Sequence, residues 1–129
     1  MIVKAKQLFQ MQDTIDRLKM AKLKPTVAFR IRKTVKSLVT ELDEIVKTHY
    51  ELLVQYGEKI VEGKYQVIRD SDKYSVFIQE FDKLMDEDID IPQSVVKLSE
   101  LSDEFVVNDY ANLSEVMIIE EDINEPREK

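Results

Sequence analysis

The hydrophobic residues between positions 31 and 56 recur at alternating steps of three and four residues. This spacing places them on one side of an α-helix and matches the heptad pattern of coiled coils. Pro25 suits the first turn of such a helix, and Gly57 suits a left-handed cap at its end. The pattern therefore predicts a helix over residues 25–56. We call its apolar side the seam, which consists of Ile31, Val35, Leu38, Leu42, Ile45, His49, Leu52 and Tyr56.

A helix of this length would outreach a compact domain. At 1.5 Å per residue it spans about 48 Å, whereas a domain of this size is about 30 Å across. A shorter apolar series predicts a first helix over about residues 4–22, and the two helices would form an antiparallel hairpin. The first helix covers only a little over half of the second. We therefore expect another surface, such as a partner protein, to bury the seam beyond Glu44. The alternative is that α-helix 25–56 is an ordinary core helix, packed entirely against its own chain.

The seam has a second, narrower apolar row beside it. Val39, Val46 and Leu53 recur every seven residues and widen the apolar face beyond that of a two-stranded zipper.

After Gly57 the pattern shortens. We predict a strand within residues 62–68, a helix over about residues 73–86 and an edge strand near residues 86–92, followed by short helical or turn segments up to residue 119. The fold class is thus mainly α: an antiparallel helical hairpin with one long helix, plus a small C-terminal α+β unit. The predicted domains are the hairpin at 1–57, the α+β unit at 58–119 packed on it, and an acidic, disordered tail at 120–129.

The composition favours a helix-rich chain and excludes several kinds of functional site. Only two glycines and three prolines are available for turns among 129 residues, and 35% of the residues are charged. The absence of cysteine excludes disulfides, thiolate metal sites and cysteine nucleophiles. No apolar run is long enough for a membrane span or a signal peptide, so we expect a soluble intracellular protein.

Charge is distributed unevenly along the chain. Residues 1–36 hold ten bases and two acids (10 − 2 = +8), whereas residues 37–129 hold nine bases and 24 acids (9 − 24 = −15). The candidate basic patch near the first predicted turn is Lys22, Lys24, Arg30, Arg32, Lys33 and Lys36. This uneven distribution of charge favours contact with oppositely charged partners. Phosphate binding by the basic patch is a less favoured alternative, because the remaining chain would repel a polyanion.

Two further features of the sequence are candidate sites. His49 is the only histidine and lies in the seam, so it is a packed side chain, or else a polar registry or pH-sensitive contact. The acidic run from Asp86 to Asp90 does not fit an EF-hand, because Ile91 and Lys97 replace the required glycine and glutamate. No nucleophile elbow, P-loop or dinucleotide-binding motif is present. We expect no catalytic, cofactor-binding or metal-binding residues and no cofactor.

Several segments together resemble a known group of proteins. They are KAKQLFQMQDTIDRL (4–18), KLKPTVAFRIRK (22–33), QYGEK (55–59), GKYQV (63–67), FIQEFDKLMDEDIDI (77–91), VVKLSEL (95–101) and DYANLSEVM (109–117). In this order they resemble a family of small uncharacterised proteins of phages and prophages of Gram-positive bacteria, over about residues 1–119. The resemblance implies a viral context, in assembly or host takeover, and carries no activity.

These observations favour a non-enzymatic phage protein that acts through protein–protein association. The seam would bind a second copy or another phage or host protein, as in a virion component, an assembly factor or a chaperone. The alternative is an acidic inhibitor of a host nucleic-acid-binding factor, either a DNA mimic or an anti-defence protein. The expected location is the host cytoplasm or the virion, with no membrane partner.

Overall fold

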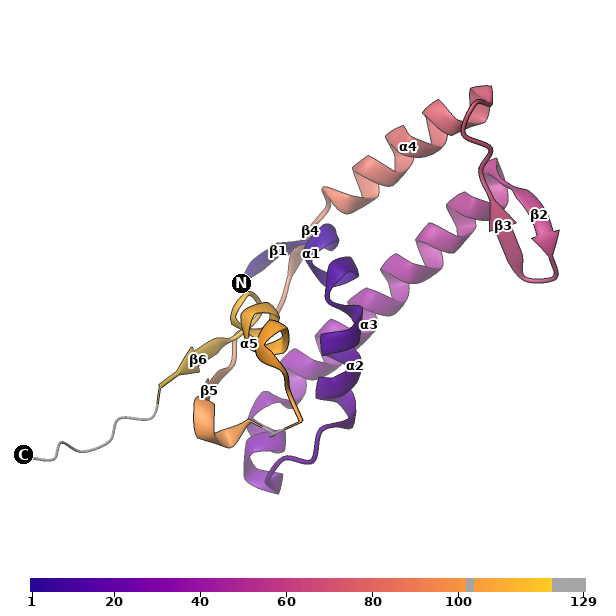
Figure 1. Cartoon of the computed structure of the whole chain (residues 1–129). Coiled ribbons are helices and arrows are strands. Elements are labelled where there is room, and N and C mark those ends of the chain that lie inside the picture. Colours follow the sequence, from indigo (N-terminus) through magenta and orange to yellow (C-terminus); the bar gives the residue numbers. More distant parts are fainter. Residues whose placement is uncertain (102–103, 122–129) are drawn as a thin grey trace, which may run out of the picture.

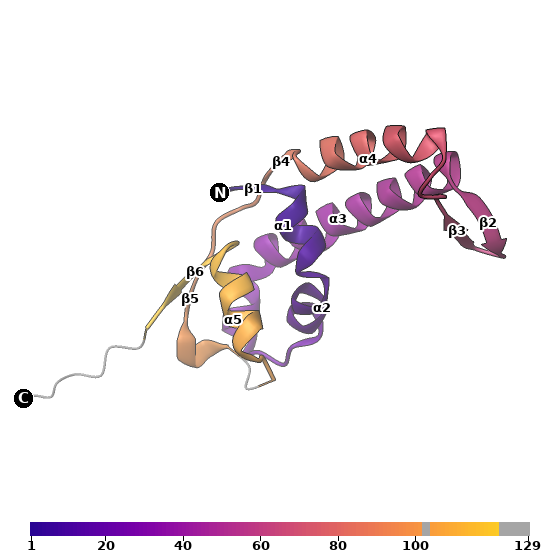
Figure 2. The same ribbon diagram turned by 45° about the horizontal axis from the view of Figure 1, so that its top comes forward.

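The computed structural model describes residues 1–101 and 104–121. It consists of a body at one end and an arm at the other, joined by the long helix α3 (Pro25–Tyr56). The arm contains the second half of α3, the hairpin of β2 (Glu58–Val61) and β3 (Lys64–Gln66), and helix α4 (Asp72–Met85). A view turned by 45° shows the same separation of arm and body (Figure 1, Figure 2).

Helix α3 has the bounds that the sequence predicted, and it is unbroken. Pro25 stands in its first turn, where a missing N–H costs no hydrogen bond. Gly57 is not the left-handed cap that we expected, since its φ is −102° and its ψ is 175°. A glycine is needed there for space instead. A Cβ atom would lie 2.4 Å from the carbonyl oxygen of Leu53 and 2.9 Å from that of Gln66.

The predicted first helix is in fact divided. The chain starts with strand β1 (Ile2–Lys4), continues as α1 (Ala5–Gln10), breaks at Met11 and resumes as α2 (Gln12–Met20). Met11 has φ −110° and ψ 30°, outside helical geometry. Its side chain is only 2% exposed, and Leu8 and Ile15 on either side are buried too. The break lets α1 contact both α3 and α4 while α2 contacts α3 and α5.

The strands pair differently from the expected strand–helix–strand unit. Strand β3 pairs with β2 in a hairpin whose turn contains Gly63 at φ 79°, a conformation that favours glycine. Strand β4 (Asp88–Asp90) pairs antiparallel with β1, with Val3 opposite Ile89. The helix predicted near residues 73–86 and the strand near Ile89 are therefore present, but the N-terminus supplies the strand's partner. The domain boundary after residue 57 stays a prediction.

The remaining elements complete the body. They are β5 (Val95–Lys97), a 3₁₀ turn η1 (Leu98–Glu100), α5 (Val107–Ser114) and β6 (Ile118–Glu120), which runs parallel to β5. Leu113 in α5 and the following Val116 and Met117 are buried. The expected acidic tail falls largely on residues 122–129, outside the described residues.

Burial in the hydrophobic core corrects the hypothesis that the seam is an open interface. Ile31, Leu38, Leu42 and Ile45 are 1%, 0%, 6% and 4% exposed, so they are core residues of the single chain. The expectation that the seam lies uncovered beyond Glu44 is wrong for Ile45, because α1 and α4 pack against α3 there. The other members are half-buried: Val35, His49, Leu52 and Tyr56. The alternative of an ordinary core helix therefore describes the seam better than an open interface does.

Candidate interaction surface

His49 lies in an aromatic cluster on the arm side of the core. Its ring centroid is 5.2 Å from that of Phe9, 5.3 Å from that of Phe81 and 6.5 Å from that of Phe77. Burial lowers the pKa of His49 below 6.5, because desolvation disfavours the charged ring. These neighbours come from α1 and α4. His49 therefore packs between helices of its own chain, in agreement with the prediction of a packed side chain.

A different side of α3 carries apolar side chains that the chain leaves open. Val46, Tyr50 and Val54 stand four residues apart, so they follow one another along the helix, and they are 39%, 42% and 41% exposed. Val39 and Leu53 are half-buried along the edge of the same row. At 100° per residue this row is turned by roughly 90° from the middle of the seam. We call these five residues the flank stripe.

The flank stripe continues into exposed apolar residues at both ends. Toward the tip, the Tyr50 ring meets the Tyr65 ring edge-on at a centroid distance of 6.0 Å, and Ile60 and Val61 in β2 are 60% and 54% exposed. Toward the body, a shallow groove of about 280 Å³ lies between α2 and α3. Its lining includes Leu18, Leu23, Ala28 and Val35. The apolar surface thus follows α3 along most of its length.

Charged residues of both signs border the flank stripe. At 100° per residue, the exposed residues that point within about 60° of Tyr50 are Arg32, Lys36, Asp43 and Lys47. Among the described residues, none of these four forms an ion pair with another side chain. Their charges are therefore available to a partner that lies along α3.

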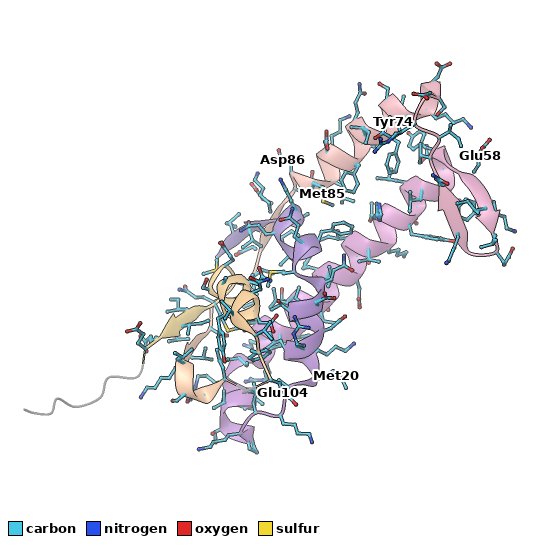
Figure 3. The ribbon with its side chains drawn as sticks, viewed as in Figure 1. Met20, Glu58, Tyr74, Met85, Asp86 and Glu104 are labelled. Atoms are coloured by element: carbon cyan, nitrogen blue, oxygen red, sulfur yellow. The ribbon has the colours of Figure 1, made fainter. Side chains whose placement is uncertain are left out.

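The predicted basic patch is exposed but is not a uniform cationic surface. Arg30 donates two hydrogen bonds to Glu100, at 2.8 and 3.0 Å, and this pairing lowers the pKa of Glu100 to about 2. The Arg32 guanidinium lies 3.7 Å from the centre of the Phe29 ring. Lys22 and Lys24 line an open hollow of about 660 Å³ that also contains Glu100 and Glu104. Carboxylates thus stand among the bases at the body end, where Figure 3 labels Glu104 and Met20.

The acidic run is partly neutralised within the chain. The Lys4 ammonium lies 2.8 Å from Asp88 and 3.4 Å from Asp86, and the N-terminal amine lies 3.2 Å from Asp90. Figure 3 shows Asp86 at the body end of α4, opposite the tip where Tyr74 and Glu58 lie. Across residues 1–101 and 104–121, no group of three or more acidic or histidine side chains is placed to hold a metal ion.

Sequence reasoning missed a buried ionic group in the body. Asp109 lies in the first turn of α5, and its side chain is fully buried. It accepts hydrogen bonds from Thr14 at 2.6 Å, from Arg17 at two positions 2.7 Å away and from the Val106 backbone N–H at 2.9 Å. These donors hold the pKa of Asp109 well below its usual range. The group ties α2 to α5, so its role is structural.

Comparison with known proteins adds no relative: no protein-family model, curated protein or solved structure matches this chain. Within the part of the chain that the structure describes, no helix is both long and apolar enough to cross a membrane.

Proposed function

We propose that this chain acts by binding other proteins through the flank stripe of α3, as a phage virion component, assembly factor or chaperone. The observation that carries the proposal is the exposed row of Val46, Tyr50 and Val54 on a helix whose seam is already covered. Exposed apolar rows bordered by charges are typical of protein contact surfaces. The viral context rests on the sequence resemblance.

The size of the apolar row limits how it can bind. Burying the remaining exposed parts of three such side chains would contribute about 3 kcal/mol, whereas micromolar affinity needs about 8 kcal/mol. A partner must therefore also contact the neighbouring groove, the exposed charges or the β2–β3 hairpin. This requirement favours an elongated partner that lies along α3 over a small one bound at a single point.

Site-specific photo-crosslinking in producing cells tests this function. A benzoylphenylalanine residue would replace Tyr50 in one variant and Gln55 in a matched control, because both positions are exposed on α3 but point in directions about 140° apart. We expect discrete cross-linked protein products from position 50 and none from position 55. Absence of products at position 50, or the same products at both positions, would contradict a binding role for the flank stripe.

A further inference from the structure

The groove between α2 and α3 combines an apolar floor with a basic rim. The charged residues that line it are Lys19, Arg32 and Lys36, and none of the described residues along it is acidic. Val35, at the end of the groove, stands one helical turn before Val39, so the groove opens onto the flank stripe. The groove and the stripe therefore form one apolar surface with bases at its body end.

Two of these bases have no acid beside them to offset their charge. Residues 19–36 contain seven bases and no acid. Arg32 and Lys36 stand four residues apart on α3, a spacing at which like charges destabilise a helix. Arg32 donates a hydrogen bond to the carbonyl oxygen of Phe29 at 2.6 Å and lies over its ring, and neither contact cancels the charge. A partner that supplies carboxylates would relieve this repulsion.

The other charges along this surface compensate one another. Lys19 stands three residues after Asp16 on α2, and Lys47 stands four residues after Asp43 on α3, so each base has an acid as its helical neighbour. The positive charge that remains is that of the two bases on α3 at the groove. The screening length is about 8 Å at physiological salt, so these local charges act on a bound partner more strongly than the net charge of the whole chain.

We infer that the groove and the flank stripe bind an amphipathic helix of a different protein, which carries carboxylates beside its apolar row. The inference rests on the proposed function and names the chemistry of the partner. From Ala28 to Val46 the surface follows a single unbroken helix for about 27 Å, the length of about five helical turns. An amphipathic helix fits such a surface by placing apolar residues at intervals of three and four into the groove.

The apolar floor favours a protein over a nucleic acid as the partner. Nucleic-acid affinity comes largely from contacts between bases and phosphates, to which aliphatic side chains add nothing. Leu18 and Ile31 are the deepest floor residues, and Leu23 and Val35 remain partly exposed beside them. A ligand that covers these side chains must itself be apolar on one face.

Charge reversal at the groove tests the inference in cells. Benzoylphenylalanine at position 50 is combined with Arg32→Glu and Lys36→Glu in one chain, and with Lys64→Glu and Lys73→Glu in a matched control. All four positions are exposed, so both chains should fold as the wild type does, by circular dichroism. We expect the cross-linked product to fall at least about tenfold in the first chain and to stay within about twofold in the control.

Defined ligands test the chemistry directly. The first is a labelled peptide of about 18 residues, with leucines spaced by three and four residues and glutamates beside them. The second carries lysines in place of the glutamates, and the third is a DNA strand of the same length. We expect fluorescence anisotropy to show binding of the glutamate peptide at least about tenfold more tightly than that of either other ligand.

A second variant separates the apolar floor from the charges. Ala28→Arg places a long side chain over the floor of the groove and adds a positive charge. We expect it to weaken binding of the glutamate peptide at least about fivefold, because apolar contact is lost although the charge becomes more favourable. Unchanged or tighter binding by this variant would overturn the role of the groove.

The outcomes separate this inference from the function it rests on. Equal product from position 50 in both charge-reversed chains, or DNA binding as tight as that of the glutamate peptide, overturns the acidic helix and leaves the binding role standing. A product of two copies of this chain overturns the inference of a different protein. Absence of any product at position 50 in the otherwise wild-type chain overturns both.

Discussion

At the scale of single residues, Asp109 shows how a buried charge is made tolerable. Its carboxylate receives four hydrogen bonds from α2 and from the start of α5. Replacing it with asparagine keeps the shape but removes the charge that pairs with Arg17. The side chain of Arg17 is 41% exposed, so water can solvate its unpaired charge, and the loss of the charge-assisted hydrogen bonds costs about 2 kcal/mol of unfolding free energy.

We therefore expect Asp109→Asn to lower the free energy of unfolding by about 2 kcal/mol in urea denaturation. Asp13→Asn, at an exposed position of α2, is the matched control and should change it by less than about 0.5 kcal/mol. Equal effects of the two substitutions would show that the buried network does not hold α2 and α5 together.

His49 gives a pH prediction with a definite sign. Its folded-state pKa is lowered below 6.5, so the unfolded chain binds more protons than the folded chain just below that pH. The contribution of the neutral ring is fully present above pH 6.5 and is lost as the pH falls through the folded-state pKa. Glu100 titrates near pH 2 in the folded chain, so its own loss of stability comes in a separate window below about pH 4.5.

Thermal unfolding between pH 7.5 and 5.5 tests the histidine contribution. Wild type should lose stability over this range, and His49→Phe should lose much less, because phenylalanine fits the ring cluster and does not titrate. A wild-type melting temperature that rises on acidification, or equal slopes for both proteins, would contradict the assignment.

At the scale of secondary structure, Gly57 ends α3 as predicted, but the physical reason for a glycine at this position differs from the predicted one. The sequence pointed to a left-handed cap, and the structure instead requires free space between Leu53 and Gln66. Two backbone atoms crowd that space, so a side chain cannot be accommodated by a simple rotation.

We expect Gly57→Ala to destabilise the junction between α3 and the β2–β3 hairpin by about 1–3 kcal/mol, a typical cost of overpacking. Hydrogen exchange should show faster exchange at the amides of β2 and β3. Glu58→Ala, at the next and exposed position, serves as the control and should leave these amides unchanged. Unchanged protection in Gly57→Ala would refute the steric explanation.

Helices with strong periodicity were predictable from the sequence, and contacts between distant segments were not. The bounds of α3 followed from apolar spacing together with Pro25 and Gly57, and the helix predicted over about residues 73–86 matches α4. The break at Met11 has no glycine or proline to mark it. The pairing of β1 with β4 joins residues more than 80 positions apart, which local patterns do not encode.

The same distinction applies to the candidate surface. The recurrence of Val39, Val46 and Leu53 showed that the apolar face of α3 was wide, and two of these residues border the exposed row. Which side would remain open depended on where α1 and α4 packed. Tyr50 and Val54 therefore became visible as surface residues only in the folded chain.

At the scale of the whole molecule, the two apolar sides of α3 differ in burial. The seam packs within the chain, and Val46, Tyr50 and Val54 of the flank stripe stay exposed. The two sides predict different results for a substitution by aspartate. Leu42→Asp places a charge in the core and should unfold the chain, whereas Val46→Asp changes only an exposed position.

The most direct test of the account is photo-crosslinking from benzoylphenylalanine at position 50, in an otherwise wild-type chain and in a chain that also carries Val46→Asp. The account predicts discrete cross-linked protein products from the first chain and at least about tenfold less product from the second, with an unchanged melting temperature because position 46 is exposed. Equal amounts of product from both chains, or no product from the otherwise wild-type chain, would contradict binding through the flank stripe.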